Sequence, residues 1–161
     1  MKNKLFAIAL AAGMMVLLPL GTSHVYAAGA GTVSYTQSIH NQTDVFPGAN
    51  PCTGVPGTLT QTYNSVFHVT TQTSGETWAT FTQTGSVSFV PDDSAQPSYS
   101  GHATFWGNFN LNQQSSNSTS TSSIRVVGTD GSVITQHDVA HFLVTPTGVT
   151  VSWDKPTLTC G

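Results

Sequence analysis

Apolar and polar residues alternate with a period of two along most of the chain after residue 32, and turn residues separate the alternating segments. The clearest case is residues 99–111. There Tyr, Phe, Ala, Gly and Leu alternate with Ser, His, Thr, Trp and Asn. Successive side chains of a strand point to opposite faces of a sheet, so this pattern predicts a β-strand with one core-facing side. That side consists of Tyr99, Gly101, Ala103, Phe105, Gly107, Phe109 and Leu111.

The same alternation predicts further strands over most of the remaining chain. Their ranges are 32–40, 63–70, 76–90, 124–127, 133–144 and 149–157. We expect turns between them where Gly, Pro and Asp gather, because these residues favour the backbone conformations of turns. The run 113–123, rich in Gln, Ser, Asn and Thr, is expected to be a mobile loop tip that extends into strand at its end. No segment shows the period of an amphipathic helix.

Seven or eight antiparallel strands joined mostly by short hairpins predict a single all-β domain. Long strands in simple sequential order favour an up-and-down β-barrel, because closure removes the edges that such strands would otherwise expose. A two-sheet β-sandwich is the alternative, since alternation does not distinguish the two architectures. Gly101 and Gly107 lie on the predicted core side and are expected to relieve crowding or to permit strong coiling of the sheet.

The first 27 residues have the features of a secretory signal peptide. Met1–Lys4 is a short basic start, residues 5–20 are almost wholly apolar, and Val25-Tyr26-Ala27 matches a small-x-small cleavage site. An uncleaved membrane anchor is the alternative, but the cleavage site and the breaking residues Pro19 and Gly21 favour secretion. We therefore predict a signal peptide over residues 1–27 and one extracellular domain over residues 28–161.

Cys52 and Cys160 are the only cysteines of the chain. In an oxidising compartment they are expected to form one intramolecular disulfide. Free thiols used for redox or metal chemistry are the alternative, which would require closely spaced or electropositive cysteines. A bond across this long separation would stabilise the domain by about 4 to 5 kcal/mol in the chain-entropy model.

Charged residues are scarce in the predicted mature domain. Loss of the signal peptide leaves two basic residues, Arg125 and Lys155, against seven acidic ones. This balance excludes a basic footprint for nucleic acid and a polybasic patch for membranes in the mature form. Hydroxyl groups of Ser and Thr must therefore hydrate most of the surface.

Several short motifs, taken in their order along the chain, resemble a known group of proteins. They are Asn50-Pro51-Cys52-Thr53-Gly54, Phe89-Val90-Pro91-Asp92-Asp93, Tyr99-Ser100-Gly101, Thr104-Phe105-Trp106-Gly107, Asp130-Gly131-Ser132, His137-Asp138-Val139-Ala140-His141 and Lys155-Pro156 with Cys160. Together they resemble uncharacterised small secreted all-β proteins of soil-dwelling, actinomycete-type bacteria. The resemblance spans residues 50–161 and implies secretion and a single all-β domain, but it implies no activity.

Histidines are the main candidates for chemistry, namely His68, His102, His137 and His141. His137 and His141 lie four apart in a predicted strand, which separates their α-carbons by about 13 Å and makes a shared metal difficult. No Gly-x-Ser-x-Gly motif supports a serine nucleophile. We therefore predict no metal and no cofactor, and an enzyme that uses histidine with a carboxylate or a metal is the less favoured alternative.

Aromatic residues are the second set of candidates. Trp106 lies opposite the predicted core side and on the same side as His102, where an exposed tryptophan would indicate a contact surface. Trp78, Trp153, Tyr63 and Tyr99 are further candidates for aromatic platforms.

The sequence thus predicts an extracellular binding or interaction module. Its expected ligand-binding residues are Trp106, His102, His68, His137 and His141. The expected partner is a small molecule, a glycan or a protein. A structural protein of the cell envelope is a further alternative.

Overall fold

The computed structural model describes residues 23–29, 31–112, 115–145 and 148–161, and within these residues the chain forms strands and no helix. All strands belong to one sheet. They are β1 (Ser23–Gly29), β2 (Thr32–Ala49), β3 (Pro56–Gln72), β4 (Thr77–Pro91), β5 (Tyr99–Leu111), β6 (Ser116–Gly128), β7 (Val133–Thr145), β8 (Gly148–Asp154) and β9 (Thr157–Cys160).

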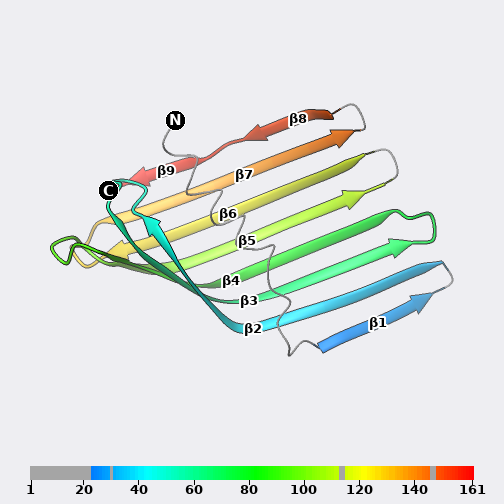
Figure 1. The fold of residues 1–161 in the computed structure, drawn as a ribbon, viewed down its shortest axis with the longest axis horizontal. Helices are drawn as coiled ribbons and strands as arrows, with labels where there is room; N and C mark the ends of the chain where they lie inside the picture. Colours follow the sequence, from blue (N-terminus) through cyan, green and yellow to red (C-terminus); the bar gives the residue numbers. More distant parts are fainter. Residues whose placement is uncertain (1–22, 30, 113–114, 146–147) are drawn as a thin grey trace.

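Each strand from β1 to β7 pairs antiparallel with the next one along the chain (Figure 1). β8 pairs with residues 140–145 of β7, and β9 pairs with residues 134–137 of the same strand. The predicted strand over 149–157 is therefore two strands, interrupted at Lys155-Pro156, because proline cannot donate to the ladder. The predicted all-β class and the sequential antiparallel order are confirmed.

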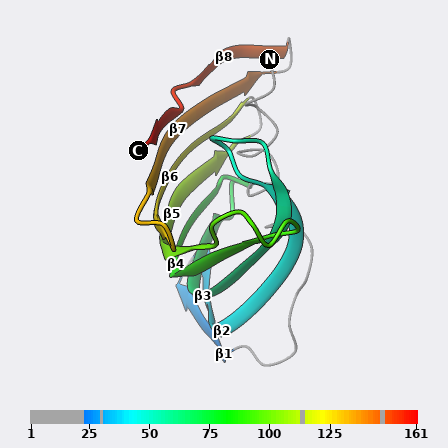
Figure 2. The ribbon, with the colours of Figure 1, turned by 90° about the vertical axis from the view of Figure 1, so that its left-hand side faces the viewer.

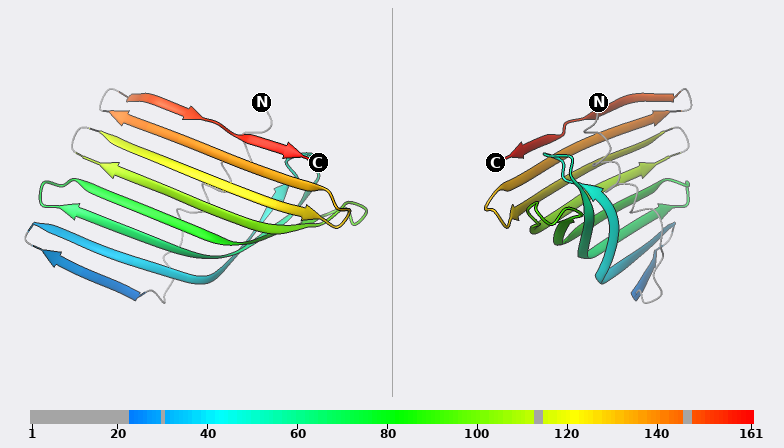
Figure 3. Two further views of the ribbon diagram at one scale, coloured as in Figure 1. Left: turned by 180° about the vertical axis from the view of Figure 1, so that it is seen from behind. Right: turned by 60° about the vertical axis from the view of Figure 1, so that its left-hand side comes forward.

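The sheet does not close into a barrel within the described residues. Its ladder begins at β1 and ends at β8 and β9, and no pairing joins these edges. Instead the sheet coils strongly at one end, where the hairpin between β2 and β3 arches over its inner side (Figures 2 and 3). The prediction of a closed barrel rested on strand order, but order alone does not determine how far a sheet curls. The molecule therefore differs from the predicted barrel and has a curled end and an open end.

The disulfide holds the curled end together. Cys52 lies in the turn between β2 and β3, Cys160 ends β9, and their α-carbons are 6.0 Å apart. The predicted pairing is confirmed. Cys52 follows a long strand directly, because β2 continues beyond its predicted end at residue 40 to Ala49.

The two faces of the sheet differ in character. We call the face that carries Tyr99 and Ala103 the inner face and the face that carries Trp106 the outer face. A buried apolar cluster fills the inner face at the curled end, and it consists of Leu59, Val87, Phe89, Tyr99, Ala103, Val126 and Ile134. At the open end the predicted core side is incompletely covered, since Phe109 is 40% and Leu111 is 43% exposed.

Glycines permit the close approach of strands on the inner face. A β-carbon on Gly101 would overlap the backbone of Arg125 and Val126 on β6, and one on Gly107 would overlap the ring of Phe81 on β4. Gly85, on β4, similarly lies against the backbone of β3. The role predicted for Gly101 and Gly107 is confirmed.

The hydroxyl-rich run and β2 differ most from their predicted structure, and β3 begins at Pro56, before the predicted start at residue 63. The hydroxyl-rich run was expected to be mostly loop, yet β6 begins at Ser116 and pairs along its length with β5 and β7. Its partners on both sides satisfy its backbone, so low sequence complexity did not prevent strand formation. β2 is twice as long as predicted because a bulge between Ile39 and Gln42, with Asn41 at φ 52°, shifts the register and interrupts the alternation.

Most of the predicted signal peptide, residues 1–22, lies outside the described residues. The predicted cleavage site Val25-Tyr26-Ala27 falls within β1. Among the described residues no helix is long and apolar enough to cross a membrane.

Candidate functional site

The outer face carries the five residues predicted from the sequence as ligand-binding, namely Trp106 and four histidines. His102 and Trp106 share one side of β5, and the register places Trp106 opposite Thr121 of β6 and through it Val139 of β7. His137 and His141 flank Val139 at two-residue spacing and thus lie on the same face. His68 of β3 also lies on the outer face, because it pairs with Thr80 of β4, which lies on that face.

The other two tryptophans also lie on the outer face. Trp78 is four residues from Thr82, which pairs with Trp106, and Trp153 pairs with His141. Trp106 is 43% exposed and Trp153 is 39% exposed, while Trp78 is half-buried. Strand spacing and rise place the α-carbon of Trp106 about 14 Å from that of Trp78 and about 16 Å from that of Trp153. The three indoles therefore form separate platforms on one surface.

Hydroxyl groups on neighbouring strands hold three of the histidines. The Nδ1 atom of His68 is 2.7 Å from Thr36 Oγ1, and Nε2 of His102 is 2.9 Å from Thr84 Oγ1. In the third pair, Nδ1 of His141 is 2.8 Å from Thr119 Oγ1. Each histidine is thus oriented by a threonine across the strand.

His141 also supports the platform of Trp153. The two rings are stacked with centroids 5.9 Å apart and planes inclined by 28°. Lys155 places its Nζ atom 5.5 Å from the centroid of the Trp153 ring, at a distance that allows a cation–π interaction. Thr119, His141 and Trp153 therefore form a chain of contacts across β6, β7 and β8 that fixes one exposed indole.

The histidines do not converge. His68 lies on β3 and His141 on β7, so three strands separate them, and the described residues contain no group of three or more His, Cys, Asp or Glu side chains able to hold a metal ion. Within the described part of the chain these histidines therefore do not meet in one pocket.

The carboxylate beside His137 points the other way. Asp138 lies on the inner face near Asp154 of β8, and its Oδ1 atom is buried without a hydrogen-bond partner. Burial, followed by the hydrogen bond and the negative charge of Asp154, raises the pKa of Asp138 to about 6. The pair lies on the face opposite the histidine rings, so it does not form a dyad with them.

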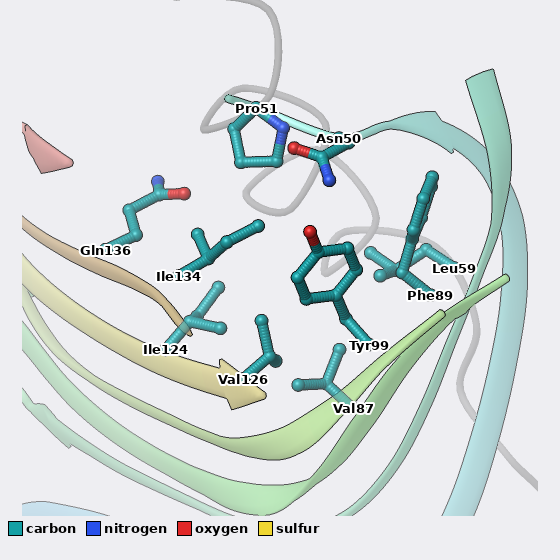
Figure 4. A pocket seen from close by; sticks show the side chains of 10 residues that line it. All are labelled: Asn50, Pro51, Leu59, Val87, Phe89, Tyr99, Ile124, Val126, Ile134 and Gln136. Atoms are coloured by element: carbon teal, nitrogen blue, oxygen red, sulfur yellow. The ribbon is translucent and has the colours of Figure 1, made fainter. Parts of the chain in front are cut away.

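A small apolar cavity lies at the curled end, beneath the turn that carries Cys52 (Figure 4). Its volume is about 40 Å³, far below the roughly 300 Å³ at which sites for small molecules begin. Asn50 and Pro51 cover it, and Tyr99 and Ile134 are among the core side chains below. We interpret it as a packing gap of the core.

The structure separates the aromatic candidates that the sequence grouped together. Tyr99 belongs to the core, and Tyr63 lies on the inner face, where its hydroxyl donates to Asp44 Oδ2 at 2.9 Å. Only the register shows that Trp78 and Trp153 share a face with Trp106, because alternation does not reveal which strands pair.

No family model, curated protein or solved structure matches the chain.

Proposed function

We propose that the protein is a secreted extracellular module that binds a neutral polysaccharide on the outer face of its sheet. The placement of Trp78, Trp106 and Trp153 on one hydroxyl-rich face is the observation that carries this proposal. We regard the sheet as an opened up-and-down barrel. The disulfide and the buried core at the curled end keep the outer face and its three indoles rigid.

The chemistry of the outer face favours sugars over the other partners. Indole rings stack on the apolar faces of sugar rings, and the surrounding hydroxyl, amide and imidazole groups can exchange hydrogen bonds with sugar hydroxyls. Among the described residues this face carries two basic side chains, Arg125 and Lys155 beside the Trp153 ring, so the face offers little attraction to a polyanion.

The spacing of the indoles argues against the other two partner classes. Residues that dominate protein–protein binding cluster near the centre of an interface. Here Trp106 is about 14 to 16 Å from the other two tryptophans, with polar side chains between them. A small molecule would require a concave site, and the 40 Å³ cavity at the curled end is too small for one. A long polymer can contact separated platforms at once.

The proposal is tested by binding of the secreted protein to insoluble neutral polysaccharides such as cellulose, chitin and xylan. Alanine at Trp106 or Trp153 should weaken binding about 5- to 30-fold each, corresponding to about 1 to 2 kcal/mol. Val66→Ser is the matched control, because Val66 is 42% exposed on the same face and is not aromatic. It should bind like the wild type.

Salt provides a second test of the ligand class. Binding to a neutral polymer should change little between 0.05 and about 0.5 M salt, because no ion pairs are screened. Loss of binding at high salt would indicate an anionic ligand. Absence of binding to every neutral polymer, or equal binding by the tryptophan variants, would refute the proposal.

A further inference from the structure

The inner face at the open end carries a second group of exposed apolar side chains. β5 contributes Phe109 and Leu111, β7 contributes Phe142 and Val144, and Ser116 and Ser118 of β6 lie between them. The exposed fractions of the four apolar side chains lie between 40% and 44%. These values are high for large apolar residues that share one face of a sheet.

The rings deeper on this face are already ordered. Phe81 stacks on Phe105 with centroids 5.6 Å apart, and Tyr35 packs edge-on against Phe67 at 6.2 Å. A sheet with an apolar face is stable when a second layer covers that face. The described strands form one sheet, and its arched hairpin covers the curled end only. The open end therefore presents a preformed surface that lacks a described second layer.

We propose that this face binds a second copy of the chain, so that two sheets pack face to face as an intermolecular β-sandwich. The surface extends across β2 to β7, about 29 Å for six strands at a spacing of 4.8 Å, and along about 20 Å of strand. Two copies would bury about 1,100 Å², which exceeds the roughly 1,000 Å² that a specific interface needs.

Charge permits this self-association. Among the described inner-face side chains of the open end, the charged ones are Asp138 and Asp154, and both lie at the β7–β8 margin. The aromatic centre can thus be desolvated without burying a charge. A lipid headgroup or an acidic peptide would find no basic partner there.

The curled end determines how the copies can face each other. The arched hairpin occupies the inner side at that end (Figure 3), so two curled ends placed together would collide. A two-fold axis perpendicular to the strands places the open half of one copy over the open half of the other, with the curled ends at opposite extremities. This arrangement is isologous and closed, and it leaves both outer faces free.

Sedimentation velocity of the protein purified from culture medium, at about 1 to 200 µM, tests the proposal. We expect a monomer–dimer equilibrium in this range, given the small interface. Phe109→Ser combined with Phe142→Ser should shift the dissociation constant at least about 10-fold toward monomer. Val66→Ser, which changes an equally exposed apolar residue of the outer face, should leave it unchanged.

A measurement on the wild type avoids dependence on the folding of a variant. Binding of an apolar fluorescent dye per chain should fall as the concentration passes through the dissociation constant, because the dimer covers the face. A monomer at all concentrations would overturn the proposal, as would a dimer whose dye binding does not change. Two results of native mass spectrometry would also overturn the proposal. One is a monomer with a bound apolar molecule, and the other is a monomer that retains residues 1–27.

Discussion

Removal of the disulfide tests how the curled end contributes to stability. The bond joins Cys52 to Cys160 across 108 positions and connects the hairpin between β2 and β3 to the last strand at the far edge of the sheet. The chain-entropy model assigns such a loop about 4 to 5 kcal/mol. With an unfolding entropy of about 2.1 cal/mol/K per residue over a domain of about 134 residues, this loss lowers Tm by about 16 °C.

Cys52→Ser combined with Cys160→Ser is the perturbation, and thermal unfolding followed by circular dichroism is the assay. Stabilities of small domains are about 5 to 15 kcal/mol, so we expect the variant to be folded at room temperature with its strand signal intact. Wild-type protein treated with reductant should unfold at the same Tm as the double variant. Hydrogen exchange should show that faster opening extends beyond the turn into the strands of the core.

A fall in Tm of less than about 5 °C would refute this reasoning. It would mean that the bond only fastens the turn around Cys52 and that the unfolded chain gains little freedom without it. Faster exchange confined to residues 50–55 would identify that case directly. Complete unfolding of the variant at room temperature would instead show that the core cluster cannot hold the curl alone.

Three further predictions follow from single contacts. Gly101→Ala forces a β-carbon into the backbone of β6 and should cost about 1 to 3 kcal/mol in denaturant unfolding, whereas Gly161→Ala, where a β-carbon would meet only Val133 O at 4.0 Å, should be neutral. Asp138→Asn should raise the free energy of unfolding above pH 6 and change it much less below pH 4. The folded-state pKa of Asp138, about 6, exceeds the usual value, so the wild type loses stability as the pH rises from 4 to 6. The same pH dependence of stability in the variant and the wild type would contradict this prediction. Thr119→Val removes the hydroxyl next to His141 Nδ1 and should alter the near-ultraviolet circular dichroism of the indoles, with a change in stability below about 1 kcal/mol.

Alternation in the sequence predicts the strands where each has one apolar and one polar side. It succeeds over residues 99–111 and 133–144, whose observed strands agree closely with the prediction. It fails at β6, where Ser and Thr occupy both faces and leave no contrast to detect. It also fails after Ile39, because a bulge changes which residues face inward. Both failures have the same origin, since the signal depends on a constant register against a buried face.

The sequence predicts the composition of the candidate site better than its geometry. The side of Trp106 followed from its own strand, and the exposure of 43% agrees with that prediction. Its neighbours follow from strand pairing, which depends on contacts between segments far apart in the chain. Closure was predicted from the same strand order, but curling depends on the local fit of Gly85 and Gly101 against adjacent backbones, which alternation does not encode.

Curling at one end only explains how one sheet can present two different surfaces. A fully closed barrel would bury Phe109 and Phe142 inside and would expose only the outer face. A flat sheet would leave the core cluster without the cover that the arched hairpin now provides. With one end curled, the buried cluster stabilises the chain, while the open end leaves exposed the apolar face that we propose binds a second copy. Because that contact uses the inner face, a dimer would direct its two sets of tryptophans in opposite directions. Two polymer surfaces could then be held by one particle, and the avidity of that linkage would depend on dimerisation as well as on the indoles.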